Sequence, residues 1–312
     1  MTPAPKRVVL LGPQREHPDV GRVAGAFRGS APVALVTAGW QEWEGEDGAL
    51  KGAIGGDVLN LRLYARAEKV WAADPELADG HRTLQRDVRL LRQAYNVRLA
   101  RAMDAWTELL SLPGDAQVLD PERDSALASV QELDRHHARR LQSLREEFYG
   151  RFDPLMRTSV GREREEIQRA LASVSVVVVA GGHVAGLLNR LRLFGVDQLL
   201  AGKTVVAFSA GAMALASRVV LFHDSPPWGP GHAELGEVGL GMAPGVVALP
   251  DAATRLRLDD PGRVARLARR FAPDACVLLD PGNRVEWDGG WHAHFARRLR
   301  LDGWAEEWRG AA

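Results

Sequence analysis

The chain has 312 residues and no net formal charge, because 40 lysines and arginines balance 40 aspartates and glutamates. A hydrophobic fraction of 46% is typical of a globular chain with room for two domains, and the neutral balance argues against a general affinity for nucleic acid. The single cysteine cannot form an internal disulfide, and no apolar run is long enough to cross a membrane. We therefore expect a cytoplasmic protein with neither nucleic acid nor membrane as a partner.

Two short β-strands are predicted near the start of the chain, over residues 8–12 and 33–38, where β-branched and other apolar residues run together. Trp40 and Trp43 follow the second strand, with acidic neighbours. Ligands bind at the carboxyl ends of the strands in open α/β folds, so Trp40 is a candidate for lining a substrate pocket. The alternative is that the two tryptophans pack against the helical segment that comes next.

The character of the chain changes over residues 64–171, where apolar residues recur every three or four positions and so predict two long amphipathic helices. The Pro-Gly pair at 113–114 ends the first helix, and the Asp-Pro pair at 120–121 is the predicted N-cap and first turn of the second. The sequence thus predicts an antiparallel helical hairpin, followed by a shorter helix over residues 162–172. The two apolar stripes are Leu84, Val88, Leu91, Tyr95, Leu99, Ala102, Trp106 and Leu109, and then Leu127, Val130, Leu133, His137, Leu141, Leu144, Phe148 and Phe152.

A hairpin of two helices has little core of its own and must bury its stripes against something else. Three roles are open for it: a dimerisation arm, a lid or partner-docking module, and a cover over an exposed face of the sheet. We favour the first and expect a homodimer formed through this segment. The arginines of the second helix alternate with acidic residues, which predicts a solvated, ion-paired face. These arginines are Arg135, Arg139, Arg140 and Arg145.

Two strand-to-helix junctions in the second half of the chain carry the candidate chemistry. Residues 176–179 are four consecutive valines, which predicts a strand buried on both faces, and a Gly-Gly-His turn follows at 181–183. A second apolar run at 205–208 leads to Ser209, which small residues follow, so that a tight turn is possible. A serine on such a strained turn can serve as a nucleophile. The alternative is that Ser209 only caps the next helix.

These junctions resemble those of peptidase family S51, the serine peptidases that include aspartyl dipeptidase and cyanophycinase. The resemblance as a whole covers residues 6–62 and 172–302. It implies an α/β fold, a three-layer sandwich with a mainly parallel sheet of the class I glutamine amidotransferase type. The matching segments are residues 181–183, 208–212, 239–247, 261–267 and 277–299.

The domain organisation follows from the same resemblance. Residues 1–63 and 172–312 would form the amidotransferase-like domain. Residues 64–171 exceed the single helix that the family has at this place, so we interpret them as a helical insertion.

The resemblance also assigns a nucleophile and an oxyanion hole. Ser209 matches the family nucleophile. The backbone N–H groups of Gly182 and Ala210, with Gly181 beside them, match the donors that hold the oxyanion.

Charged residues downstream complete the expected site. Asp224 matches the acidic member of the triad in the dipeptidase branch. Guanidinium groups form forked hydrogen bonds with carboxylates, so we expect Arg255, Arg257 or Arg263 to pair with an acidic group of a peptide or small substrate.

The chain departs from the family at the position of the general base, where Asp251 replaces the family's histidine. A serine hydroxyl needs a base within reach, and a carboxylate is a weaker base than an imidazole. Either His183 or His223 completes the site, or the site is altered. Two functions therefore stay open: a serine hydrolase of the S51 type with an altered triad, and a degenerate scaffold that binds a ligand or a partner protein through the helical insertion. We expect no cofactor and no metal, since no group of cysteines and histidines has zinc-site spacing.

Overall fold

The computed structural model describes residues 4–15, 18–224 and 231–310. Within these residues the strands form a sheet of seven, a sheet of four and a ribbon of two. The strands are β1 (Arg7–Leu11), β2 (Val33–Val36), β3 (Val58–Asn60), β4 (Val176–Val179), β5 (Thr204–Phe208), β6 (Arg218–Leu221), β7 (Glu234–Val238), β8 (Val246–Pro250), β9 (Ala275–Leu279), β10 (Arg284–Trp287), β11 (Trp291–His294), β12 (Arg297–Leu299) and β13 (Ala305–Glu307).

Helices connect most of the strands, and none of the described helices is long and apolar enough to cross a membrane. The α-helices are α1 (Val20–Arg28), α2 (Gly48–Ile54), α3 (Leu63–Ala73), α4 (Pro75–Ser111), α5 (Ala116–Phe152), α6 (Thr158–Ala172), α7 (Val184–Leu193), α8 (Val196–Leu199), α9 (Ala210–Leu215), α10 (Ala252–Arg255) and α11 (Pro261–Phe271). Two 3-10 helices, η1 (Ala38–Trp43) and η2 (Pro154–Met156), complete the described elements.

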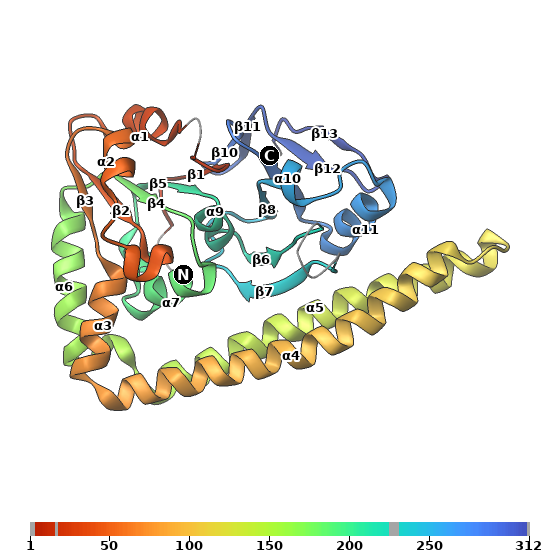
Figure 1. The fold of residues 1–312 in the computed structure, drawn as a ribbon, viewed down its shortest axis with the longest axis horizontal. Coiled ribbons are helices and arrows are strands. Elements are labelled where there is room, and N and C mark those ends of the chain that lie inside the picture. Colours follow the sequence, from red (N-terminus) through yellow and green to blue (C-terminus); the bar gives the residue numbers. More distant parts are fainter. Residues whose placement is uncertain (1–3, 16–17, 225–230, 311–312) are drawn as a thin grey trace.

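The seven-stranded sheet has the order β11-β10-β1-β5-β4-β2-β3. The five strands from β1 to β3 in this order are parallel, and β10 and β11 are antiparallel additions at one edge. Alternate residues of each parallel strand point to opposite faces, so Val8 and Leu10 join one buried cluster while Val9 and Leu11 join another. Helices α1 and α2 cover one face, and α3, α6, α7 and α9 cover the other (Figure 1). The predicted α/β fold with a mainly parallel sheet is confirmed.

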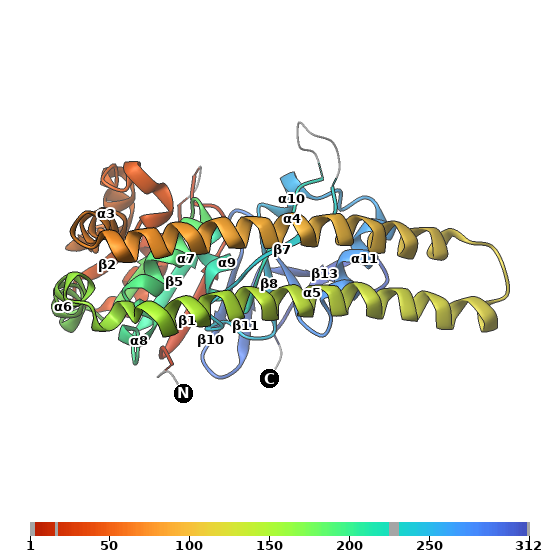
Figure 2. The ribbon, with the colours of Figure 1, turned by 90° about the horizontal axis from the view of Figure 1, so that it is seen from below.

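The predicted helical hairpin is confirmed as α4 and α5, which run antiparallel along one side of the molecule (Figures 1 and 2). Its stripes are buried within the chain: Tyr95, Leu99 and Trp106 of α4 pack with Val130 of α5 and with Leu235 of β7. The stripes therefore do not require a second copy of the chain to cover them, and homodimerisation stays a prediction.

The predicted start of the second helix is wrong. Helix α5 begins five residues earlier than Pro121 with Asp115 as its N-cap, whose carboxylate accepts a hydrogen bond from the backbone N–H of Gln117 at 2.9 Å. Pro121 lies inside the helix. It sits in an early, exposed turn, where its missing N–H removes one hydrogen bond while packing along the rest of the long helix remains.

The predicted ion-paired face of α5 is confirmed for two of its arginines, since Arg135 and Arg139 both pair with Glu132 on the surface. It is wrong for Arg145, which is buried and paired with Glu237 of β7. The partner lies in a distant part of the sequence, so spacing along the helix could not indicate it.

A buried polar cluster joins the hairpin to the body of the molecule. Arg270 of α11 donates to both carboxylate oxygens of Asp134 of α5, at 2.7 and 2.8 Å, and to the hydroxyl of Tyr95 of α4 at 2.8 Å. The Tyr95 hydroxyl donates to Asp134 at 2.8 Å and accepts from the N–H of Leu235 at 3.1 Å. Only 1% of the Arg270 side chain and 3% of the Asp134 side chain are exposed. Each buried charge therefore needs the other as its partner, because an unpaired charge in the interior would destabilise the fold.

The hairpin also contains a buried histidine that makes the stability of the fold depend on pH. The ring of His137 stacks on Tyr95 with centroids 4.1 Å apart, and burial lowers the pKa of His137 to about 4 from an ordinary 6.5. Between these pH values His137 is protonated in the unfolded chain but stays neutral in the folded chain. The free energy of unfolding should therefore fall as pH falls from 6.5 to 4. The slope from this group should stay below about 1.4 kcal/mol per pH unit.

Urea denaturation at several pH values tests this expectation. The variant His137→Gln should show a shallower loss of stability in that window than the original chain. His136→Gln serves as the matched control, because His136 is exposed on the same helix. An unchanged slope in His137→Gln would contradict the assignment.

Candidate functional site

Ser209 occupies the sharp junction between β5 and α9, and its backbone is strained. Its φ is 52° and its ψ is −124°, in a region that residues other than glycine rarely adopt. The side chain makes no capping hydrogen bond to α9. Ser209 is thus the N-cap residue of α9 by position but does not cap it through its side chain, and its strained backbone is similar to that of a nucleophile turn, so its role as a nucleophile stays a prediction.

The Gly-Gly turn after β4 lies directly beside this serine. Strands β4 and β5 are parallel neighbours in the sheet, which brings their carboxyl ends together as predicted. A Cβ added to Gly181 would lie 2.8 Å from the Cβ of Ser209 and 3.2 Å from the N of Ala210. Gly182 has a φ of 109°, and a Cβ there would lie 2.4 Å from the carbonyl oxygen of Gly39. Only glycine allows the two turns to approach so closely.

The two proposed oxyanion donors are free of backbone partners. Neither the N–H of Gly182 nor that of Ala210 donates a hydrogen bond to another described residue. Both residues line the cavity into which Ser209 faces. Unpaired N–H groups beside a serine can hold the negative charge that develops on a carbonyl oxygen.

This cavity, which we call the serine cavity, has a volume of about 570 Å³. It lies between the ends of β5 and β8, and residues from both sides of it contribute polar groups. They are Arg15, Gly182, Ser209, Ala210, Asp251, Thr254 and Arg255. A second hollow of about 510 Å³ shares Arg15, Gly182 and Ser209 with it and is lined on its far side by Trp40. Ser209 therefore lines both hollows and Trp40 lines the second, while the role of Trp40 in binding a substrate stays a prediction.

Asp251 lies in the serine cavity, immediately after β8. Its backbone is left-handed, with φ 61° and ψ 38°. One carboxylate oxygen accepts a hydrogen bond from the Thr254 hydroxyl at 3.0 Å, and the other lies 4.0 Å from Nε of Arg255. The carboxylate is partly exposed and has capacity for further hydrogen bonds. It is thus the acid that the structure places in the same cavity as Ser209.

The two histidines that were candidates for completing the site do not line either hollow. His183 caps α7, where its Nδ1 accepts a hydrogen bond from the N–H of Gly186 at 3.0 Å. His223 is exposed, just beyond β6. None of the other described histidines lines the serine cavity, and Asp251 is the carboxylate among the residues that do.

The remaining predicted residues divide between two places. Arg255 lines the serine cavity, whereas Asp224, Arg257 and Arg263 line a separate cavity beside the hairpin. There the Asp224 carboxylate accepts hydrogen bonds from Nε of Arg263 at 3.2 Å and from the N–H of Arg257 at 3.1 Å. The structure therefore does not bring Asp224 into the space that Ser209 and Asp251 share.

Arg15 and Thr254 are site residues that the sequence interpretation missed. Arg15 follows the first strand, at the same carboxyl edge of the sheet as Trp40, so the position of ligands in open α/β folds could have indicated it. Thr254 gives no signal in the sequence beyond its nearness to Asp251.

Among solved structures, the chain is similar to the crystal structure of a peptidase from an acI-B1 Actinobacterium. The two share 11% sequence identity with a TM-score of 0.47, and the match covers 99% of each chain. No protein-family model and no curated protein sequence matches this chain. What the chain does must therefore be inferred from the geometry of its own cavities.

Proposed function

We propose that the protein is a serine hydrolase of the S51 peptidase type with an altered triad, in which Asp251 takes the place of the base. The strained backbone of Ser209 beside the Gly-Gly turn carries this proposal. Strain at a non-glycine residue is retained where the surrounding structure fixes it, and it occurs preferentially at functional sites. The conformation is not explained by side-chain capping, because the hydroxyl makes no cap hydrogen bond to α9.

The proposed reaction uses these groups in turn. Oγ of Ser209 attacks the carbonyl carbon of a peptide bond while its proton passes to the Asp251 carboxylate. The carbonyl oxygen becomes an oxyanion, to which Gly182 and Ala210 donate hydrogen bonds. The C–N bond then breaks as the protonated Asp251 carboxyl passes its proton to the leaving amine, and a water molecule hydrolyses the acyl-enzyme by the same steps.

The cations of the serine cavity suggest the substrate. Arg15 and Arg255 both line it, and together they suit a substrate with a carboxylate close to the bond that is cleaved. Trp40 would contact the apolar part of the substrate in the second hollow. Acidic dipeptides are therefore the substrates to test first.

The domain organisation belongs to the same proposal. Residues 1–63 and 172–312 would form a class I glutamine amidotransferase-like domain that holds the whole serine cavity. Residues 64–171 would be an insertion, since no residue of this range lines that cavity.

Labelling with a serine-reactive fluorophosphonate, read by intact mass, tests the proposal. We expect one label per chain, and none in Ser209→Ala. Ser143→Ala is the matched control, because Ser143 is a half-buried serine on α5 whose hydroxyl donates a hydrogen bond to the helix backbone, away from the serine cavity. Absence of labelling in the original protein between pH 5 and 9, a span that covers the titration of histidine, would reject an activated serine.

A second candidate function is a degenerate scaffold that binds a ligand or a partner protein. One observation favours it: no described histidine lines the serine cavity. The end of the hairpin projects beyond α11 and exposes Leu112 and Val118, which gives a partner or a second copy of the chain a surface to contact (Figure 1). A protein that resists labelling but elutes as a dimer, and as a monomer after truncation of the hairpin tip, would favour this candidate.

A further inference from the structure

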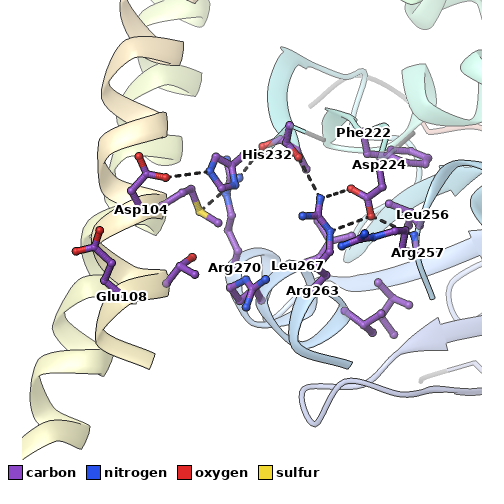
Figure 3. A pocket seen from close by; sticks show the side chains of 17 residues that line it. Asp104, Glu108, Phe222, Asp224, His232, Leu256, Arg257, Arg263, Leu267 and Arg270 are labelled. Atoms are coloured by element: carbon purple, nitrogen blue, oxygen red, sulfur yellow. Dashed lines mark hydrogen bonds and ion pairs between the residues drawn. The ribbon is translucent and has the colours of Figure 1, made fainter. Parts of the chain in front are cut away.

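A third cavity lies between the hairpin and the body of the molecule, away from Ser209. It has a volume of about 380 Å³, within the range of about 300–1,000 Å³ that is usual for small-molecule sites. One wall is α4 and the other is α11 with the strands and loops next to it (Figure 3). We call it the hairpin cavity.

The two helices present matching faces to this cavity. Met103, Asp104 and Glu108 lie on one side of α4, and Arg263, Arg266 and Leu267 lie on one side of α11. The spacing of four residues between Asp104 and Glu108, and of three and four from Arg263 to Arg266 and Leu267, places these side chains on one face of each helix. The α4 wall is therefore acidic, the α11 wall is basic, and apolar side chains lie between the charges.

Some of the charges in the hairpin cavity are already satisfied. Arg263 holds the Asp224 carboxylate, and Arg270 is fully engaged by Asp134, Tyr95 and the carbonyl oxygen of Ala233. These groups shape the cavity and fix its rear wall. They have little capacity left for a ligand.

Other charges are less engaged. Glu108 is exposed, and neither it nor Arg266 makes a hydrogen bond or close ion pair with another described residue, although the charge of Arg266 acts on Asp260. Asp104 is half-exposed and lies 3.7 Å from Nε2 of His232, which leaves its second carboxylate oxygen for a ligand. The cavity thus offers carboxylates with remaining acceptor capacity on one wall and a guanidinium with remaining donors on the other.

We propose that the hairpin cavity binds a small zwitterion with an apolar body, of the class of short peptides with free termini and apolar side chains. Its carboxylate would accept forked hydrogen bonds from Arg266, and its ammonium group would donate to Asp104 and Glu108. Its side chains would contact Met103 and Leu267. A ligand with both charges and an apolar middle can contact both walls, whereas a simple anion or cation pairs with only one of them.

The hairpin cavity borders the serine cavity. Phe222 lines both, and the backbone N–H of Asp224 donates to the carbonyl oxygen of Arg255 at 2.8 Å. A ligand in one cavity therefore contacts a side chain that also forms the wall of the other. Ser209 does not line the hairpin cavity, so this binding site does not depend on the proposed hydrolase activity.

Isothermal titration calorimetry with three matched probes tests the proposal, using full-length Ser209→Ala protein so that no probe is consumed. The probes are leucyl-leucine, N-acetyl-leucyl-leucine, which lacks the ammonium group, and leucyl-leucinamide, which lacks the carboxylate. We expect leucyl-leucine to bind, and each blocked form to bind about tenfold or more weakly, because each loses one set of charge-assisted hydrogen bonds.

Two variants assign the binding to this cavity. Arg266→Gln should abolish the preference for leucyl-leucine over the amide, and Asp104→Asn with Glu108→Gln should abolish the preference over the acetylated form. Arg101→Gln is the control, since Arg101 is an exposed cation of α4 that does not line the cavity. The proposal is overturned if leucyl-leucine does not bind, if the three probes bind equally, or if both preferences survive in these variants.

Discussion

Replacing Arg270 with alanine should lower the free energy of unfolding by about 3–5 kcal/mol, the usual cost of leaving one charge of a buried pair without its partner. Arg270 supplies the donors for both oxygens of Asp134, and both side chains are almost completely buried. Without the guanidinium, the Asp134 carboxylate keeps only the Tyr95 hydroxyl as a donor among the contacts that the structure describes. Urea denaturation followed by circular dichroism measures the change.

Two comparisons separate this effect from a general loss of charge. Arg139→Ala removes a cation from an exposed ion pair of α5 and should cost only about 0–1 kcal/mol. Adding Asp134→Asn to Arg270→Ala should recover part of the lost stability, because the amide does not carry an uncompensated charge. If Arg270→Ala were no more harmful than Arg139→Ala, the cluster would not be holding the hairpin to α11.

The parts of the fold that could be predicted from the sequence are those set by local patterns. Four consecutive valines gave β4, and apolar residues at helical spacing gave both arms of the hairpin. The arginines of α5 and α11 show the limit of this approach. The residues next to Arg145 and Arg270 in the sequence do not distinguish them from exposed arginines. Their buried partners, Glu237 and Asp134, lie far away in the sequence.

The candidate site shows the same division. The closeness of Ser209 and the Gly-Gly turn could be predicted, because neighbouring parallel strands end at the same edge of the sheet. The separation of Asp224 from Ser209 could not, because it depends on how the segment after β6 lies against Arg263 of α11. The left-handed backbone of Asp251 was also not apparent, since an aspartate after a strand gives no sign of its φ.

Asp251→Asn should reduce the rate of fluorophosphonate labelling at Ser209 by about 10²–10⁴-fold, the contribution that a positioned general base usually makes. Asparagine has nearly the same shape, tolerates the left-handed backbone at this position, and can still accept the hydrogen bond from Thr254. The substitution therefore removes the ability to accept a proton while it leaves the cavity intact. The second-order rate constant of inactivation is the quantity to measure.

Asp224→Asn is the matched control, since it makes the same chemical change in the neighbouring cavity. Its labelling rate should stay close to that of the original protein if Asp251 is the base. Asp251→His should keep or increase the rate, because imidazole is a stronger base than a carboxylate near neutral pH. If Asp224→Asn lost labelling while Asp251→Asn kept it, the assignment would be reversed. Ser209 and Asp224 would then have to approach each other when substrate binds.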